Sequence, residues 1–175
     1  MDGLSFDPII GQEVGVVGRP GVFRIVHVYH PGEEHPNPNL RTLEGRSGTV
    51  DLRRDEDGFG LPAIPWYRLK YVDDTGPVRH AIEWLKTNPD GRKYPDYIVG
   101  YEVETGTDHA GNPSIFVHFS IDPDYFYENG QASQEKIAKL NEFTYEFQQM
   151  LLSLGLSRWT YVRASEARRT LDVAS

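Results

Sequence analysis

The sequence predicts an α+β protein made of two small folding units, on three observations. Before the segment Thr75-Gly76-Pro77, short runs rich in β-branched and aromatic residues alternate with glycine and proline, and no helix-length apolar stripe occurs. After that segment, one long amphipathic helix is set among strands with alternating apolar residues. A chain of 175 residues is also long enough for two small domains. We therefore expect one domain over residues 1–76 and a second over residues 77–175.

The first domain is expected to be all-β. Its expected elements, in chain order, are strands over residues 13–17 and 22–29, a polar loop over 30–46, a strand over 48–53, a turn over 54–58, and a closing segment over 61–72 with one tight turn at 65–68. The loop contains too much proline and glycine for a regular element, and we expect it to be mobile.

This order of elements ends in Pro65-Trp66-Tyr67-Arg68-Leu69 and resembles the small SH3-like barrels, including Tudor- and KOW-type modules, over about residues 10–73. Such modules bind peptides, proteins or nucleic acid and seldom catalyse reactions. The resemblance implies an SH3-like β-barrel with a recognition groove lined by Tyr29, Trp66 and Tyr67. The alternative is that these three aromatic side chains pack the core of the domain.

The second domain is expected to be a two-layer αββαβ sandwich. Its expected elements are a helix over residues 78–87, strands over 97–104 and 114–122, an irregular connector over 122–130, a long helix between Ser133 and Gly155, and a strand over 159–164 before a frayed C-terminal end. Alternation places Tyr97, Val99, Tyr101 and Val103 on one face of the first strand, and Ile115, Val117, Phe119 and Ile121 on one face of the second. These faces are expected to be buried by the long helix.

The order helix, strand, strand, helix, strand, over about residues 78–164, resembles the type II KH topology, particularly that of ribosome-binding-factor proteins. The family contacts a nucleic-acid backbone through a Gly-x-x-Gly loop between two helices. This chain departs from the pattern, because Gly130 stands alone before the long helix. The resemblance therefore implies the topology and leaves the nucleic-acid function without its motif.

Arginine and aromatic residues concentrate near the C-terminus. Trp159, Tyr161 and Arg163 share a strand face by alternation, and with Arg158, Arg168 and Arg169 they would form a strip on which nucleic-acid bases stack. The alternative is that the aromatic side chains cover the long helix while the arginines face solvent.

Composition limits the function classes. The net charge is −8 and evenly spread, since residues 1–77 carry 8 Lys and Arg against 12 Asp and Glu, and residues 78–175 carry 10 against 14. This balance opposes phosphate-driven nucleic-acid binding and favours a basic partner. The absence of cysteine excludes disulfides, thiolate metal sites and cysteine nucleophiles. Neither a secretion signal nor a membrane span is expected, so we predict a cytoplasmic protein with no membrane partner.

No cofactor, metal or catalytic site is predicted. The clustered side chains of metal-ligand type are His27, His30, Glu33, Glu34 and His35. Most of them lie in the proline-rich loop without regular spacing, which favours a solvated loop. His118 and Asp122 are four residues apart on a strand, about 13 Å by the strand rise, which is too far for a hydrogen bond.

The favoured function is that of a non-enzymatic interaction or adaptor protein that binds a protein partner, basic in character, through the barrel aromatics or an interdomain groove. Nucleic-acid binding through the barrel and the Trp159–Arg169 strip is the first alternative, and an enzyme with a histidine-based site is the second. The candidate binding residues are Tyr29, Trp66, Tyr67, Trp159, Tyr161 and Arg163.

Overall fold

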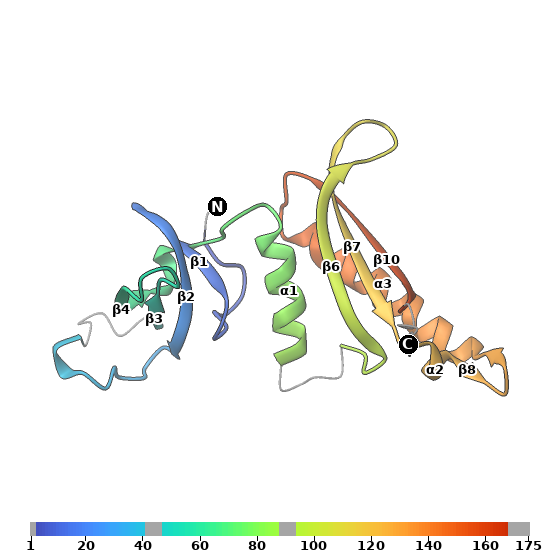
Figure 1. Ribbon diagram of the computed structural model, residues 1–175, viewed down its shortest axis with the longest axis horizontal. Coiled ribbons are helices and arrows are strands. Elements are labelled where there is room, and N and C mark those ends of the chain that lie inside the picture. The colour runs from blue at the N-terminus through green and yellow to red at the C-terminus, as the bar shows by residue number, and fades with distance from the viewer. Residues whose placement is uncertain (1–2, 41–46, 88–93, 168–175) are drawn as a thin grey trace, which may run out of the picture. The chain divides into compact units, whose positions relative to one another are not determined.

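The computed structural model describes residues 3–40, 47–87 and 94–167 (Figure 1). The chain divides into two compact units, Met1–Trp84 and Leu85–Ser175. The division falls inside helix α1 (Gly76–Thr87), later than the expected boundary between residues 76 and 77. In the first unit α1 packs on the N-terminal segment as far as Trp84, whose ring stacks on that of Phe6 with centroids 5.0 Å apart.

The first unit contains one antiparallel five-stranded sheet in the order β4-β3-β2-β1-β5. Its strands are β1 (Glu13–Val16), β2 (Arg19–Tyr29), β3 (Thr49–Arg53), β4 (Gly60–Pro65) and β5 (Leu69–Lys70). The predicted tight turn is a 3-10 helix at Trp66–Arg68, and a second one lies at Pro38–Leu40. The expected barrel is not closed, because β4 and β5 form opposite edges of the sheet in the described residues.

The core of the first unit lies on one face of this sheet. It consists of the buried side chains Val14, Val16, Phe23, Ile25, Val50, Leu52, Leu61 and Leu69. Apolar burial of this kind is the main favourable contribution to folding. Phe23 and Ile25 alternate along β2 and are both buried. A β-bulge between Ile25 and His27 then shifts the alternation, so that His27 is exposed and Val28 packs against the core.

Gly48 is required by the packing at the end of this core. A Cβ atom at this position would overlap the ring of Trp66 and lie 2.6 Å from the carbonyl oxygen of Tyr29. We therefore expect Gly48→Ala to lower the free energy of unfolding of the first unit by about 1–3 kcal/mol, the usual cost of overpacking. Urea denaturation measures the effect. Gly3→Ala is the control, because an added Cβ atom there has nothing within 4 Å and the free energy of unfolding should not change. Gly18→Ala would not serve, because Gly18 has φ +78°, which strains alanine.

The second unit is a three-stranded sheet in the order β10-β7-β6, with helix α3 along one face (Figure 1). Its elements are β6 (Ile98–Thr107), β7 (Pro113–Ile121), α2 (Pro123–Phe126), β8 (Tyr127–Glu128), β9 (Gln131–Ala132), α3 (Gln134–Ser153) and β10 (Trp159–Glu166). The central strand β7 is antiparallel to β6 and parallel to β10. The predicted α+β class is confirmed.

The buried face of β7 is as predicted, since Ile115, Val117, Phe119 and Ile121 are all at most 4% exposed. They face α3. The ring of Phe119 contacts two rings of this helix, Phe143 at 5.5 Å and Phe147 at 5.3 Å between centroids. The apolar stripe of α3 is confirmed at Phe143, Phe147 and Leu151, which are buried. The helix begins after Ser133 and is followed by Gly155 in the left-handed conformation, also as predicted.

Three local predictions in this unit are wrong. Val99 is 59% exposed and its neighbour Ile98 is buried, because a β-bulge between Ile98 and Gly100 shifts the alternation by one residue. The connector over 122–130 is not irregular: Asp122 caps the short helix α2 by accepting from the N–H of Asp124, and β8 and β9 form a hairpin. The last strand is longer than expected, because β10 continues to Glu166, and residues 168–175 of the expected frayed end lie outside the described residues.

Candidate binding sites

Tyr29 takes part in a half-buried polar network centred on Asp51. Its hydroxyl donates to Asp51 Oδ2 at 3.0 Å, and burial followed by this carboxylate raises the pKa of Tyr29 above its ordinary value. His35 Nε2 lies 3.0 Å from Asp51 Oδ1, while its Nδ1 accepts from the N–H of Asn37, so the ring donates to the carboxylate. The backbone N–H of Ala63 also donates to Asp51. Asp51 thus ties the loop after β2 to β3 and β4.

The other two predicted aromatic residues of the first unit differ in exposure. Trp66 is half-buried against the core, and its Nε1–H donates to the carbonyl of Thr49 at 3.2 Å. Tyr67 is 67% exposed. Tyr29 and Trp66 therefore have hydrogen-bond partners inside the unit, and Tyr67 is the most exposed of the three predicted aromatic residues.

The histidines of the predicted loop point to different neighbours. The ring of His30 meets the edge of Trp66 at 5.7 Å between centroids, whereas His35 contacts Asp51. Over residues 3–40, 47–87 and 94–167, no three side chains of His, Cys, Asp or Glu are grouped so that they could hold a metal ion.

In the second unit, one face of the sheet is turned away from α3, and we call it the outer face. The pairing register brings together Glu104, Phe116 and Tyr161 in one row across the three strands, and Glu102, His118 and Arg163 in the next. Side chains on this face alternate with the buried set of β7. The predicted residues Trp159, Tyr161 and Arg163 therefore share one face, as alternation along β10 indicated, whereas Arg168 and Arg169 of the predicted strip lie outside the described residues.

The outer face carries two neighbouring hollows, of about 230 Å³ and about 500 Å³, which together we call the outer groove. Glu102 and His118 line both hollows. The other lining residues are Glu104, Phe116, Arg163, Ser120, Ser165 and Glu166. Glu102 and Glu104 bring two carboxylates to the groove and Arg163 one guanidinium, whereas the Glu166 carboxylate accepts a hydrogen bond from the Tyr127 hydroxyl.

Aromatic side chains lie at one end of the groove. The rings of Phe116 and Tyr161 are stacked, with centroids 5.5 Å apart and planes at 15°. The Tyr161 hydroxyl donates to Asp108 Oδ2 at 3.1 Å, and hydrogen bonds led by the backbone N–H of Asn112 hold the pKa of Asp108 below its usual range. Trp159 follows at the next position of the same face and is 55% exposed.

His118 has Ser165 as its hydrogen-bond partner, with Nε2 and Oγ 2.6 Å apart. This pair supplies two parts of a nucleophilic site, a hydroxyl and a base. In hydrolases of the serine type a third group orients the base. Within the described part of the chain, the hydrogen-bond partner of the His118 ring is Ser165.

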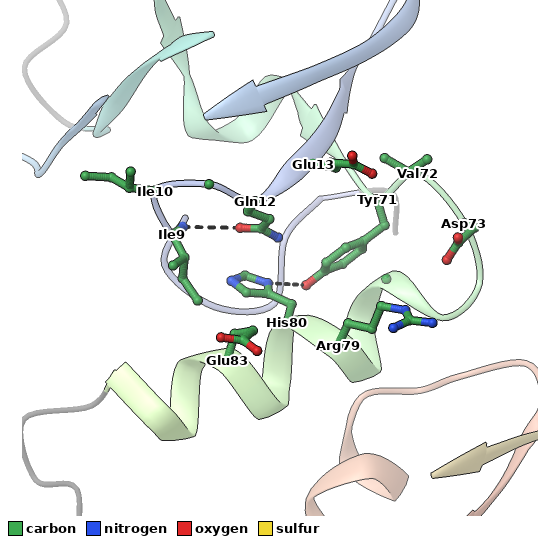
Figure 2. Close-up of a pocket in the computed structure, with 12 residues that line it drawn as sticks. Ile9, Ile10, Gln12, Glu13, Tyr71, Val72, Asp73, Arg79, His80 and Glu83 are labelled. Carbon is green, nitrogen blue, oxygen red and sulfur yellow. Dashed lines mark hydrogen bonds between the residues drawn. The ribbon is translucent and has the colours of Figure 1, made fainter. Parts of the chain in front are cut away.

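The first unit contains a separate cavity of about 390 Å³ beside helix α1 (Figure 2). Its walls are the segment 9–13, the connector 71–73 and one side of α1, so every lining residue belongs to the first unit. His80 of α1 lies at the floor, next to the ring of Tyr71. Sequence reasoning missed this site, because the N-terminal residues that form one wall show no periodic pattern.

His80 is only 2% exposed and has partners on both ring nitrogens. Its Nε2 lies 2.8 Å from the carbonyl oxygen of Asp7, which can only accept, so Nε2 carries the proton. Nδ1 then accepts from the Tyr71 hydroxyl at 2.9 Å, and that hydroxyl oxygen accepts from the N–H of Ser5. Burial lowers the pKa of His80 and raises the pKa of Tyr71, so both are neutral at neutral pH.

No helix in the described residues is long and apolar enough to cross a membrane. Comparison of the chain with protein-family models, with curated proteins and with solved structures finds no match.

Proposed function

We propose that this chain is a non-enzymatic interaction protein whose outer groove binds a basic, extended segment of a protein partner. The observation that carries the proposal is the outer groove itself, an acidic depression with aromatic side chains at one end, on the sheet face that α3 leaves open. Glu102 and Glu104 are both exposed there. A partner segment with lysine or arginine would meet complementary charge, which favours specific and rapid association.

The aromatic end of the groove supports the same occupant. Tryptophan, tyrosine and arginine are the residue types that contribute most binding energy at protein interfaces. Trp159 offers a largely exposed indole, and Tyr161 is held in place by its stacking on Phe116 and its hydrogen bond to Asp108. An anchor that is already rigid loses little conformational entropy when it binds.

For the first unit we propose an SH3-like module, and for the second a KH-like topology. The expected order of elements supports both, including the closing 3-10 helix before β5 and the return of β10 beside β7. In the first unit Tyr67 is the residue that would contact a partner. We propose a cytoplasmic setting for the protein, which a sequence without cysteine favours.

Trp159→Ala tests the groove. We expect the variant to bind its protein partner at least about tenfold more weakly, since truncating an aromatic anchor at an interface often costs 2 kcal/mol or more, roughly thirtyfold. Its free energy of unfolding should stay within about 0.5 kcal/mol of the wild-type value, as for substitutions at other exposed positions. The full chain is used as bait in native extract, and the recovered partner is purified and titrated by calorimetry.

Tyr145→Ala is the matched control, because Tyr145 is 66% exposed on α3, an element of the opposite face. It should retain the partner with wild-type affinity. If Trp159→Ala and Tyr145→Ala bind the partner equally well, the outer groove is not the binding site.

Nucleic-acid binding is the second candidate, and the shared face of Trp159, Tyr161 and Arg163 favours it. Bases could stack there, but the phosphates would lie near Glu102 and Glu104, which repel them. Gel shifts with single-stranded RNA and DNA at low salt decide between the two candidates. Binding that falls steeply with salt and is lost in Trp159→Ala would favour nucleic acid over a protein partner.

A further inference from the structure

The segment before the first strand lies against helix α1, and we call its residues 4–8 the strap. The ring of Phe6 stacks on the ring of Trp84 with centroids 5.0 Å apart and meets the ring of His80 edge-on at 5.5 Å. Leu4 packs against the core of the sheet. The strap is part of neither a helix nor a strand, so these side-chain contacts are what attach it to the unit.

Two backbone groups of the strap are hydrogen-bonded to one pair of side chains. The N–H of Ser5 donates to the Tyr71 hydroxyl at 2.9 Å, and the carbonyl oxygen of Asp7 accepts from His80 Nε2 at 2.8 Å. The Tyr71 hydroxyl in turn donates to His80 Nδ1 at 2.9 Å (Figure 2). The position of the strap on α1 therefore depends on the protonation state of His80.

The residues that follow the strap are held in a different way. The N–H of Gly11 donates to the carbonyl oxygen of Ile25 in β2 at 2.8 Å, and the N–H of Ile25 donates to the carbonyl oxygen of Gln12 at 3.0 Å. Neither bond involves His80. The strap can therefore leave α1 while residues 11–12 stay bonded to the sheet, and a local opening of this kind costs less free energy than global unfolding.

A second proton on His80 is incompatible with the closed strap. The carbonyl oxygen of Asp7 can only accept, so Nε2 carries the proton of the neutral ring and Nδ1 is the acceptor for Tyr71. A proton on Nδ1 makes both ring nitrogens donors, and the Tyr71 hydroxyl then loses its acceptor. It also encloses a positive charge in a side chain that is 2% exposed, whereas water solvates this charge once the strap is open.

Charged and titratable groups surround His80 from every element that packs on it. They are Asp7 of the strap, Glu13 of the following segment, Tyr71 and Asp73 of the connector, and Arg79 and Glu83 of α1. The Asp7 carboxylate favours the charged imidazole, but burial outweighs it and lowers the pKa of His80 below the ordinary value of 6.5. The closed strap therefore opposes protonation.

We propose that the strap is an acid-sensitive latch: when His80 takes up a second proton, residues 4–8 leave α1 and uncover the ring of Trp84, while the five-stranded sheet stays folded. The open form binds the proton with the ordinary affinity of a histidine, and the closed form binds it more weakly. The ratio of open to closed molecules therefore rises as the pH falls below 6.5, and it levels off at the pKa of the closed form. The rise between pH 7.5 and 5.5 is at most about tenfold.

Hydrogen exchange of the full-length ¹⁵N-labelled protein at pH 7.5 and 5.5 tests the latch. Protection factors, corrected for the intrinsic exchange rate at each pH, report how often each amide opens. We expect the protection factor of the Ser5 amide to fall by about fivefold to tenfold at pH 5.5, because its bond to Tyr71 is broken in the open form. The protection factors of Gly11 and Ile25 should change by less than about twofold.

Two variants assign the response to one histidine. His80→Gln does not titrate, yet its amide can donate to the carbonyl of Asp7 and accept from the hydroxyl of Tyr71. The protection factor of Ser5 should then be the same at both pH values. His27→Gln is the matched control, because His27 is an exposed histidine of β2 in the same unit, and this variant should keep the wild-type response.

Each remaining outcome overturns the proposal. If the protection factor of Ser5 in the wild type is the same at pH 7.5 and 5.5, the strap does not respond to acid. If His80→Gln keeps the response, a different group carries it. If Gly11 and Ile25 lose protection together with Ser5, the whole unit unfolds and the strap is not a separate latch.

Discussion

Truncating Phe119 to alanine is expected to lower the free energy of unfolding of the second unit by about 3–5 kcal/mol, the usual cost of removing a fully buried phenylalanine. Phe119 is 0% exposed and lies on the central strand β7. Its ring contacts those of Phe143, Phe147 and Tyr94. The variant therefore removes the side chain that joins the sheet to α3 and leaves a cavity that rigid neighbours cannot fill.

Urea denaturation combined with hydrogen exchange measures this loss and assigns it to a unit. Amides of β6, β7 and β10 should exchange faster in Phe119→Ala, while those of β1 to β3 should keep their wild-type protection. Tyr145→Ala, at an exposed position of α3, should stay within about 0.5 kcal/mol of the wild type. A loss of less than about 1.5 kcal/mol for Phe119→Ala would show that this interior is loosely packed.

Replacing His80 by leucine is expected to destabilise the first unit by about 2–4 kcal/mol. The variant takes the acceptor from the half-buried Tyr71 hydroxyl, which keeps the N–H of Ser5 as a partner, and the donor from the carbonyl oxygen of Asp7. A polar group that loses its partner beside a buried side chain costs about 1–3 kcal/mol. Leucine fills much of the volume, so most of the loss is polar. Amides of residues 4–12 should exchange faster, because His80 anchors this segment. Unchanged stability would show that water replaces the imidazole without cost.

The same histidine gives the first unit a pH dependence of known sign. The folded pKa of His80 lies below its ordinary value of 6.5 because the ring is buried. The unfolded chain therefore binds more protons than the folded one as the pH falls below about 6.5, and stability decreases there until the folded pKa is reached. His80→Leu removes this part of the dependence. Denaturation of both proteins at pH 7.5 and 5.5 should show the smaller change in the variant.

Periodic patterns predicted the interior of the second unit well. Ile115, Val117 and Phe119 alternate along a strand, and the apolar residues of α3 recur every three or four positions. Each pattern is therefore enough to predict which face of its element is buried. The error at Val99 arises because a bulge adds one residue without any change in the apolar pattern. The hairpin β8–β9 does have a sequence signal, the pair Asn129-Gly130, because both residues adopt the positive φ that its tight turn requires.

The candidate sites could be predicted only in part from patterns in the sequence. Trp159, Tyr161 and Arg163 were placed on one face correctly, but nothing in the sequence paired Arg163 with His118 or His118 with Glu102. Strand order depends on which apolar faces meet in three dimensions. The acidic side of the outer groove was missed for this reason, although Glu102 and Glu104 alternate on their strand.

By itself the sequence determined the main strands and the long helix, the buried face of β7, the stripe of α3 and the acidic balance of both halves, because each depends on residues close together in the chain. Only the tertiary structure decided the open five-stranded sheet, the outer groove and the cavity beside α1. His80 and Asp7 are 73 residues apart and meet through one hydrogen bond. Such contacts depend on the packing of whole elements, and local periodicity carries no record of them.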